Sequence, residues 1–173
     1  MMEQYREVKK QHPQDLLMFR LGDFYELFFD DAELAARELE ITLTSREAGN
    51  NNRVPMCGVP YHAVDGYLAR LIAKGYRVAI CEQMEDPRQA KGIVKREVVR
   101  VVTPGTILSE SVLAERGNNY LALVWEEGSE LALAAADIST GEFLWALFGG
   151  ADRYPALLNQ LSRLFPAELV VMG

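Results

Sequence analysis

The stretch LLMFRLGDFYELFF (residues 16–29) gathers apolar and aromatic side chains around one glycine and two carboxylates. Leu16 to Leu21 is an apolar run of strand length, Gly22 marks a turn, and Phe24 to Phe28 is predicted to continue in an extended conformation. Alternate side chains of an extended segment share a face, so positions 24 and 26 point the same way. The pattern therefore places an apolar wedge, Phe24, beside a hydrogen-bonding group, Glu26.

The bulk properties indicate a folded protein. The chain has 173 residues, of which 49% are apolar, enough for one large domain or for one small domain and part of another. No apolar run approaches the ~20 residues of a membrane span and no signal peptide is evident, so no membrane partner is expected. Cys57 and Cys81 form no Cys-x-x-Cys pattern, and we expect two buried, reduced thiols.

The charge distribution is uneven. A net charge of −7 argues against a generic nucleic-acid binder. Residues 44–105, however, hold ten basic and six acidic residues, whereas residues 1–43 and 106–173 carry net charges of −5 and −6. This middle block permits phosphate contacts without requiring them. Its basic residues are Arg46, Arg53, Arg70, Lys74, Arg77, Arg88, Lys91, Lys95, Arg96 and Arg100.

Together with the residues on either side of it, up to position 105, the opening stretch predicts an α/β (α+β mixed) fold. In this fold a mixed β-sheet is flanked by helices. Further strands are expected at 41–44, 76–81 and 96–103, and loops at 48–53 and 85–92. The segment 54–61 is expected to be irregular because it contains Pro55, Gly58 and Pro60. Helices are predicted at 1–12, at Leu34 to Leu39 with Asp30 or Asp31 as the cap, and at 63–74 with Gly75 as its C′ residue.

A different pattern follows. Residues 106–118 are predicted to be a linker between a first domain, 1–105, and a second, 119–173. The second domain is expected to have strands at 120–125, 131–137 and 142–148, turns at Gly128 and Gly141, a helix at 152–164, and a strand at 169–172. The inner face of that helix is assigned to Leu157, Leu158, Leu161 and Leu164. This order of elements is typical of the first part of a ribonuclease-H-like fold. The sheet of such a fold needs further residues to be complete, so a truncated α/β domain is inferred.

Familiar catalytic patterns are missing from the sequence. There is no Gly-Lys dipeptide and hence no Walker loop, and two histidines cannot form a multi-histidine zinc site. Asp23 and Glu26 resemble a metal pair, but a third ligand at a recognisable spacing is absent. Asp137 is better explained as a turn-capping residue than as a catalytic acid. We therefore expect no catalytic residue, no metal and no cofactor in this chain.

Five motifs follow one another along the chain: GDFYELF (22–28), PMCGVPYHA (55–63), VAICEQ (78–83), RVVTPGT (100–106) and ADISTG (136–141). The first four, in this order, closely resemble the N-terminal part of MutS, the bacterial family of DNA mismatch sensors. The fifth resembles the connector domain of that family. The resemblance spans essentially the whole chain, and the order of the motifs makes it specific.

The resemblance implies roles for two residues. Phe24 matches the aromatic residue of the Phe-x-Glu motif, which enters the minor groove and stacks on a mispaired base. Glu26 matches the glutamate of that motif, which hydrogen-bonds the base, either by accepting from an exposed N–H or, when protonated, by donating to a purine N7. Tyr25 between them is expected to face the core, and Asp23 to be a turn residue.

Supporting contacts are less fully specified. Arg46 is a candidate phosphate ligand, and Met56, Tyr61 and His62 are candidates to line the groove beside Phe24. His62 as a helix cap is an equal alternative.

The family also implies partners. The DNA partner is a duplex with mismatches or small loops, and the full-length protein is expected to be a homodimer that uses ATP and Mg²⁺ downstream of this fragment and contacts later repair proteins. Its expected location is the bacterial cytoplasm, at the nucleoid. Two other functions fit parts of the sequence: a metal-dependent DNA repair nuclease that uses Asp23 and Glu26, and a protein-interaction adaptor.

Overall fold

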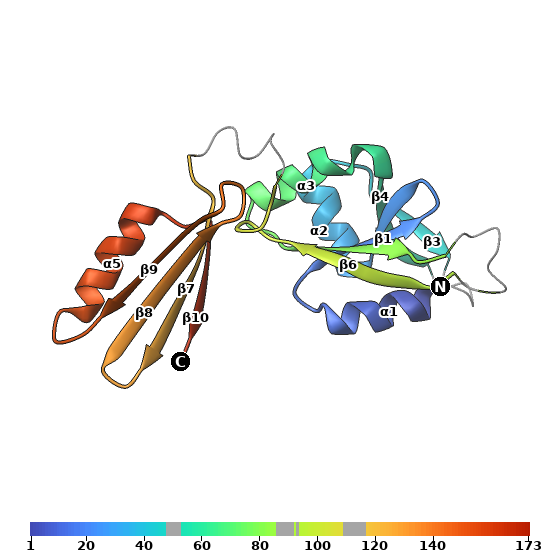
Figure 1. Ribbon diagram of the computed structural model, residues 1–173. Helices are drawn as coiled ribbons and strands as arrows, with labels where there is room; N and C mark the ends of the chain where they lie inside the picture. The colour runs from blue at the N-terminus through green and yellow to red at the C-terminus, as the bar shows by residue number, and fades with distance from the viewer. Residues whose placement is uncertain (48–52, 86–91, 93, 109–116) are drawn as a thin grey trace. The chain divides into compact units, whose positions relative to one another are not determined.

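The computed structural model describes residues 1–47, 53–85, 92, 94–108 and 117–173. It separates the chain into two units, Met1–Val102 and Thr103–Gly173, each with its own β-sheet (Figure 1). Positions 109–116 of the predicted linker lie outside the described residues, as do most of the loops expected at 48–53 and 85–92. The domain limits therefore stay predictions.

The first unit is built on a six-stranded sheet with the order β3-β4-β2-β1-β5-β6. β1 and β5 are parallel, and all other neighbouring pairs are antiparallel. Together with the helices on its two faces, this sheet confirms the predicted mixed α/β architecture. The strands are β1 (Leu16–Leu21), β2 (Phe24–Phe28), β3 (Thr44–Glu47), β4 (Arg53–Pro60), β5 (Val78–Gln83) and β6 (Arg96–Val102).

A tight hairpin joins β1 to β2. Leu21 is paired with Phe24, so only Gly22 and Asp23 form the turn. Gly22 has φ +59 while Asp23 keeps a negative φ, the pattern of a type II′ turn, which matches the twist of the two strands. Phe24 is consequently the first residue after the turn, and Asp23 is the turn residue that the sequence predicts.

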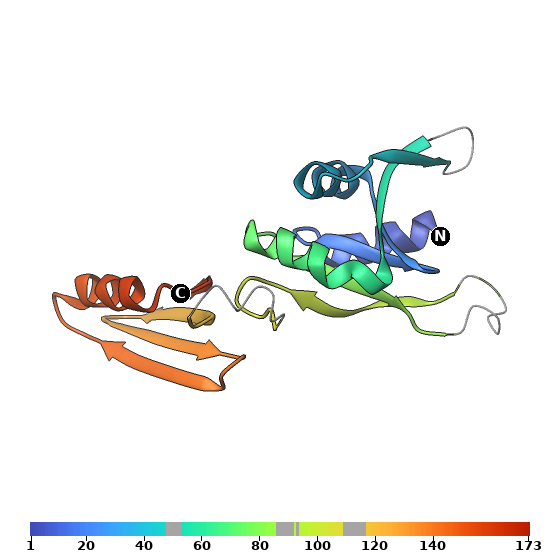
Figure 2. The same cartoon turned by 90° about the horizontal axis from the view of Figure 1, so that it is seen from above.

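Helices cover both faces of this sheet (Figures 1 and 2). On one face α1 (Met2–Gln11) packs the Tyr5 ring edge-on against Phe19 and Phe28, at centroid distances of 5.4 and 5.0 Å. On the other face lie α2 (Phe29–Leu39) and α3 (Val64–Ala73). α3 buries Leu68, Leu71 and Ile72, and it ends as predicted before Gly75, whose φ of +86 suits a C′ glycine.

A buried carboxylate ties α1, β1 and α2 together. Asp31 accepts hydrogen bonds from Lys9 Nζ at 2.9 Å, from the Leu17 backbone N–H at 3.0 Å and from the Tyr5 hydroxyl at 3.2 Å. The predicted capping role of Asp30 or Asp31 is wrong, because the N-cap position belongs to Phe28 and no side chain caps the helix. Asp31 turns inward because three donors from two other elements satisfy its charge there.

Two strand predictions need correction. The strand expected at 41–44 lies three residues later, at β3, and the segment expected to be irregular is β4, with strand partners on both sides. The prolines are tolerated because each has a strand neighbour on only one side. Pro55 pairs with Ser45 beyond the end of β2, and Pro60 pairs with Phe24 beyond the start of β3.

The second unit has a four-stranded sheet with the order β10-β7-β8-β9, in which β10 lies parallel to β7 and the other pairs are antiparallel. Gly128 and Gly141 occupy the turns with φ of +60 and +76, as predicted. Helix α5 (Arg153–Leu164) buries Leu157 against the sheet, but Leu158 is 62% exposed, so its predicted inward position is wrong. The strands are β7 (Tyr120–Glu127), β8 (Glu130–Asp137), β9 (Glu142–Phe148) and β10 (Glu168–Met172).

Asp137 caps the β8–β9 turn, as predicted. Its side chain is 1% exposed and accepts hydrogen bonds from the backbone N–H groups of Ser139 at 2.9 Å and Asn119 at 2.9 Å. The Ser139 hydroxyl adds a third bond at 2.6 Å. The carboxylate thus holds the turn against the residue that precedes β7.

Candidate nucleic-acid interface

Phe24 and Glu26 leave β2 on the same face, as the alternation predicts. Phe24 is 47% exposed, and the Glu26 side chain is 15% exposed. Phe28, on the same face, is fully buried under α1, whereas Tyr25 faces the opposite side at 5% exposure and confirms its predicted core position. This face therefore changes from buried to open toward the turn, where the phenylalanine stands.

Gly58 lies beneath both side chains. It is paired with Glu26 on β4, and a Cβ atom at this position would make ordinary contacts, 3.6 Å from Glu26 Cγ and 3.9 Å from Phe24 Cδ1. Phe24 and Glu26 thus both lie over the same backbone. This position of Gly58 was not predicted from the sequence.

Arg46 is the ionic partner of Glu26. It lies on β3, and its Nη1 atom reaches across β4 to Glu26 Oε2 at 2.5 Å. The Arg46 side chain is 41% exposed, so the pair sits at the boundary between protein and solvent. The structure therefore places the candidate phosphate ligand directly beside the candidate base-reading carboxylate.

Tyr61 lies with residues on the other face of β2. Its backbone N–H donates to the Asp23 carbonyl at 2.9 Å, and the guanidinium of Arg20 lies 3.9 Å from its ring centroid. Arg20 also lies over the Tyr25 ring, whose hydroxyl donates to Glu82. Burial and then this hydrogen bond raise the pKa of Tyr25 to about 12. These contacts support the turn, but they do not bring Tyr61 beside Phe24.

Met56 and His62 are also separate from Phe24. Met56 pairs with Phe28 and packs against the α1-side core. His62 is exposed in the short 3-10 helix η1 (Tyr61–Ala63). The alternative role of His62 as a cap is wrong, because Ala63 is the N-cap of α3 and no side chain bonds there. Phe24, Glu26 and Arg46 are thus brought together on one face, and Met56, Tyr61 and His62 are placed around it.

The basic block of residues 44–105 is partly neutralised within the protein. Besides Arg46, three of its residues pair with carboxylates: Lys74 with Glu38 at 3.0 Å, Arg77 with Asp15 at 2.8 Å, and Lys95 with Glu97 at 2.5 Å. Arg88 and Lys91 lie outside the described residues. Since a paired cation attracts phosphate less strongly, the positive block offers less to DNA than its composition indicates.

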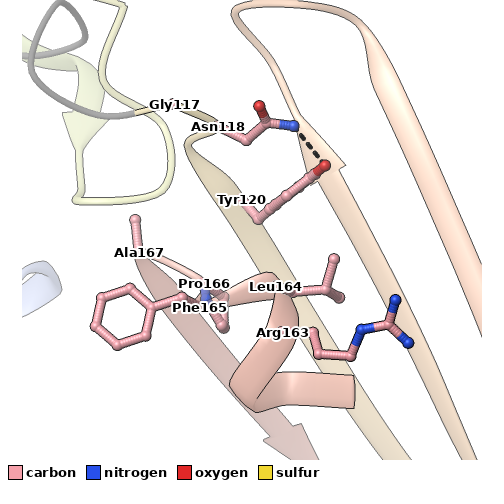
Figure 3. Close-up of a pocket in the computed structure, with 8 residues that line it drawn as sticks. All are labelled: Gly117, Asn118, Tyr120, Arg163, Leu164, Phe165, Pro166 and Ala167. Carbon is pink, nitrogen blue, oxygen red and sulfur yellow. Dashed lines mark hydrogen bonds between the residues drawn. The ribbon is translucent and has the colours of Figure 1, made fainter. Parts of the chain in front are cut away.

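In the ranges that the structure describes, no three histidine, cysteine, aspartate or glutamate side chains are grouped to hold a metal ion. A cavity of about 730 Å³ lies in the second unit and contains none of the candidate residues (Figure 3). It is lined by Gly117, Asn118, Tyr120, Arg163, Leu164, Phe165, Pro166 and Ala167.

Membrane-spanning helices were sought over the same ranges, and none of the described helices has the length and apolar character to cross a bilayer.

Comparison of the sequence with known proteins assigns this chain to a family. The model of MutS domain I matches residues 1–111. The chain is 59% identical over 173 residues to the DNA mismatch repair protein MutS of Pelotomaculum thermopropionicum, with 99% of this chain and 20% of the relative covered. For the proteins of the same name from Desulforamulus reducens and Symbiobacterium thermophilum the identities are 56% and 54%, each with 99% of this chain and 20% of the relative covered. The chain, which spans about a fifth of the length of these relatives, belongs to the MutS family.

Proposed function

We propose that this chain recognises mispaired or unpaired bases in duplex DNA and so initiates mismatch repair, with Phe24 inserted from the minor groove and Glu26 bonded to the base. The observation that carries the proposal is a half-exposed phenylalanine at the first position after a two-residue turn, held in a six-stranded sheet. Family membership supports it, since the relatives are named DNA mismatch repair proteins.

The physical basis is the deformability of DNA. Insertion of a ring between base steps costs about a few kcal/mol of unstacking and kinks the duplex. A mismatch has already lost part of its pairing and stacking, so the same insertion costs less there. A rigid sheet is the right support, because a wedge that could retreat would not transmit this difference. Phe24 would thus read weakness in stacking, without reading sequence.

Glu26 would add discrimination of a second kind. A carboxylate close to phosphates is repelled, which penalises tight binding to correctly paired DNA. At a mismatch, an unpaired base edge offers a hydrogen-bond partner that compensates this penalty. Its position on the same face as Phe24, one pleat further from the turn, suits a group that acts beside the inserted ring.

The first test replaces the wedge. In a full-length MutS protein that contains this chain, we expect Phe24→Ala to abolish the preference for a G·T duplex over a matched duplex in titrations at fixed salt. Leu43→Ala is the matched control, because Leu43 has the same 47% exposure but lies outside the site. A Phe24→Ala protein that still prefers the mismatch would refute the assignment.

The second test replaces the carboxylate. Glu26→Ala is expected to tighten binding to matched DNA several-fold, because it removes a negative charge from the DNA-facing surface. The same titrations measure it, with Glu33→Ala on α2 as a charge-matched control in the first unit. Unchanged matched affinity would eliminate a repulsive role for Glu26.

The remaining functions are proposed for the longer protein. We propose that ATP and Mg²⁺ are used by parts beyond this chain, that the full-length protein is a homodimer that contacts later repair proteins, and that it works at the nucleoid in the bacterial cytoplasm. This fragment is then a recognition module without catalysis of its own. No contact favours the nuclease alternative, since Glu26 is bonded to Arg46. Mg²⁺-dependent cleavage that Asp23→Ala abolishes would nevertheless support it.

For the second unit, we propose the beginning of a ribonuclease-H-like connector domain at 119–173, after a linker at 106–118. The position of β10, parallel to β7 at the sheet edge with α5 on one face, supports this. A structure of the longer protein is expected to show another strand paired to the open side of β10. An uncovered β10 edge in that structure would contradict the proposal.

A further inference from the structure

The Glu26–Arg46 ion pair has a consequence for how the site discriminates. Both residues are candidates to contact DNA. In the free protein they bond to each other, with Arg46 Nη1 2.5 Å from Glu26 Oε2. This bond uses one oxygen of the carboxylate and one nitrogen of the guanidinium. While it persists, each charge is partly neutralised, so Glu26 attracts a base donor less strongly and Arg46 attracts a phosphate less strongly. The two roles are therefore coupled through one contact.

We propose that Arg46 is a specificity-determining residue that exchanges partners: it holds Glu26 on matched DNA and is released to a backbone phosphate only when a mispaired base takes over the carboxylate. The inference rests on the proposed function and adds to it a second partner for Glu26. It identifies the ligand of the released arginine as a phosphate of the duplex, since phosphate fits the planar guanidinium.

The burial of the two side chains favours exchange over simple separation. The Glu26 side chain is 15% exposed and lies over Gly58, so a carboxylate left there without a partner would be poorly solvated. Arg46, at 41% exposure, can instead turn its guanidinium to solvent or to a phosphate without leaving β3. Glu26 therefore gives up Arg46 only where another donor is offered, and a matched base pair has its Watson–Crick donors engaged.

The geometry of the sheet limits the alternatives. β4 separates β3 from β2, and the Arg46 side chain crosses it diagonally, from the level of Val54 to that of Gly58, to reach Glu26. Two other cations of the first unit serve other carboxylates: Lys9 is paired with Asp31 and Arg77 with Asp15. Among the ion pairs of the described residues, Arg46 is the one that reaches Glu26.

The salt dependence of binding distinguishes exchange from a fixed phosphate contact. Each phosphate that a protein cation neutralises adds about 0.9 to the slope of log K against log salt concentration. We expect the wild-type protein to show a slope steeper by about 0.9 on a G·T duplex than on the matched duplex. Arg46→Gln should remove this difference by lowering the G·T slope, and Glu26→Gln should remove it by raising the matched slope.

The experiment measures these slopes with a full-length MutS protein that contains this chain. Its variants are Arg46→Gln, Glu26→Gln and the double substitution, with Arg53→Gln as the control. Arg53 is an exposed arginine on the neighbouring β4, and its replacement should leave the difference between the two slopes unchanged. In the double variant, the tightening on matched DNA caused by Glu26→Gln should be smaller than in the protein that keeps Arg46, because only the loss of repulsion remains and no arginine is left to be released.

Four outcomes decide the matter. Slopes that differ in the wild type and coincide in both single variants support the exchange. Equal wild-type slopes, or a difference that survives Arg46→Gln, overturn it while leaving the proposed function intact, provided that the wild type prefers the mismatch and Phe24→Ala loses that preference. If Glu26→Gln tightens matched binding equally with and without Arg46, the effect is repulsion alone and the exchange is wrong. A wild type without mismatch preference overturns both proposals.

Discussion

Arg20 and Tyr61 hold the two ends of the β1–β2 hairpin turn to the start of η1, with the Arg20 guanidinium carbon 3.9 Å from the Tyr61 ring centroid. The same guanidinium bonds the Gly22 carbonyl, and the Tyr61 backbone N–H donates to the Asp23 carbonyl at 2.9 Å. The turn that presents Phe24 is thus fixed from the face opposite to the wedge.

This relationship predicts a coupling between the two side chains. Tyr61→Leu and Arg20→Met should each destabilise the first unit, with a coupling energy of about 0.5–1 kcal/mol in a double-mutant cycle. Chemical denaturation of the 173-residue chain measures it. Additive effects would show that the stacked contact contributes nothing beyond the separate side chains.

Replacement of glycine by alanine should have opposite effects on stability at the turn residue Gly22 and at the helical residue Gly66. Gly22 has φ +59 with no atom near a built Cβ, so Gly22→Ala should cost about 1–2 kcal/mol of the free energy of unfolding through backbone strain alone. Gly66 is the matched control, because it lies within α3 with equally open space around its Cβ position. Gly66→Ala should stabilise the unit by about 0.5–1 kcal/mol. Equal effects of the two substitutions would contradict the turn assignment.

Asp137 predicts acid sensitivity of the second unit. Burial acts to raise the pKa of Asp137, but the hydrogen bonds from Ser139, Asn119 and Thr140 outweigh it and hold the pKa below its ordinary value. Because the folded-state pKa is the lower one, the stabilisation is complete above the unfolded-state pKa of about 4 and is lost as the pH falls through the folded-state value.

We therefore expect Asp137→Ala to destabilise the second unit by about 1–3 kcal/mol at pH 7, because buried N–H donors lose their acceptor. The deficit should shrink as the pH is lowered below about 4. Urea titrations at several pH values measure both effects, with the exposed Glu130→Ala on β8 as the control. A deficit that does not depend on pH would rule out an ionised Asp137 as the source of the stability.

The two cysteines should be unreactive in the folded protein. Burial, then the charge of Asp31, raises the pKa of Cys57 to about 11, and burial raises the pKa of Cys81 to about 12. Both thiols are free and fully buried. A thiol-specific disulfide reagent at pH 8 should label neither residue until denaturant is added and then label both, because the thiolate is the reactive form. Rapid labelling without denaturant would contradict the packing around them.

Much of the fold could be read from local chemistry. Gly22, Gly75, Gly128 and Gly141 occupy the turn and C′ positions expected of them, because a positive φ is a property of single residues. β1 and β2 have the predicted bounds because their apolar runs end at a turn signal. The candidate residues Phe24 and Glu26 followed from the motif together with the two-residue period of a strand.

Three of the predictions that failed depended on contacts between segments far apart in the sequence. The Pro55–Pro60 segment reads locally as irregular, yet β4 forms because each proline lies where one neighbouring strand has ended. Asp31 is a plausible cap by sequence, yet it turns inward to donors from α1 and β1. Leu158 fits the helical period but lies outside the strip of α5 that the sheet covers.

By itself the sequence identified Phe24 as the candidate wedge and Glu26 as its candidate carboxylate, since residue type, spacing and strand period are all local. Tertiary structure decided what accompanies them: Arg46, twenty residues from Glu26 in the chain, becomes its partner, and Gly58 lies beneath both side chains. It also moved Tyr61 to the other face, against Arg20. The reason is that strand order and register, which together set which residues are neighbours in the sheet, are fixed by the packing of the whole core and are not encoded in any single segment.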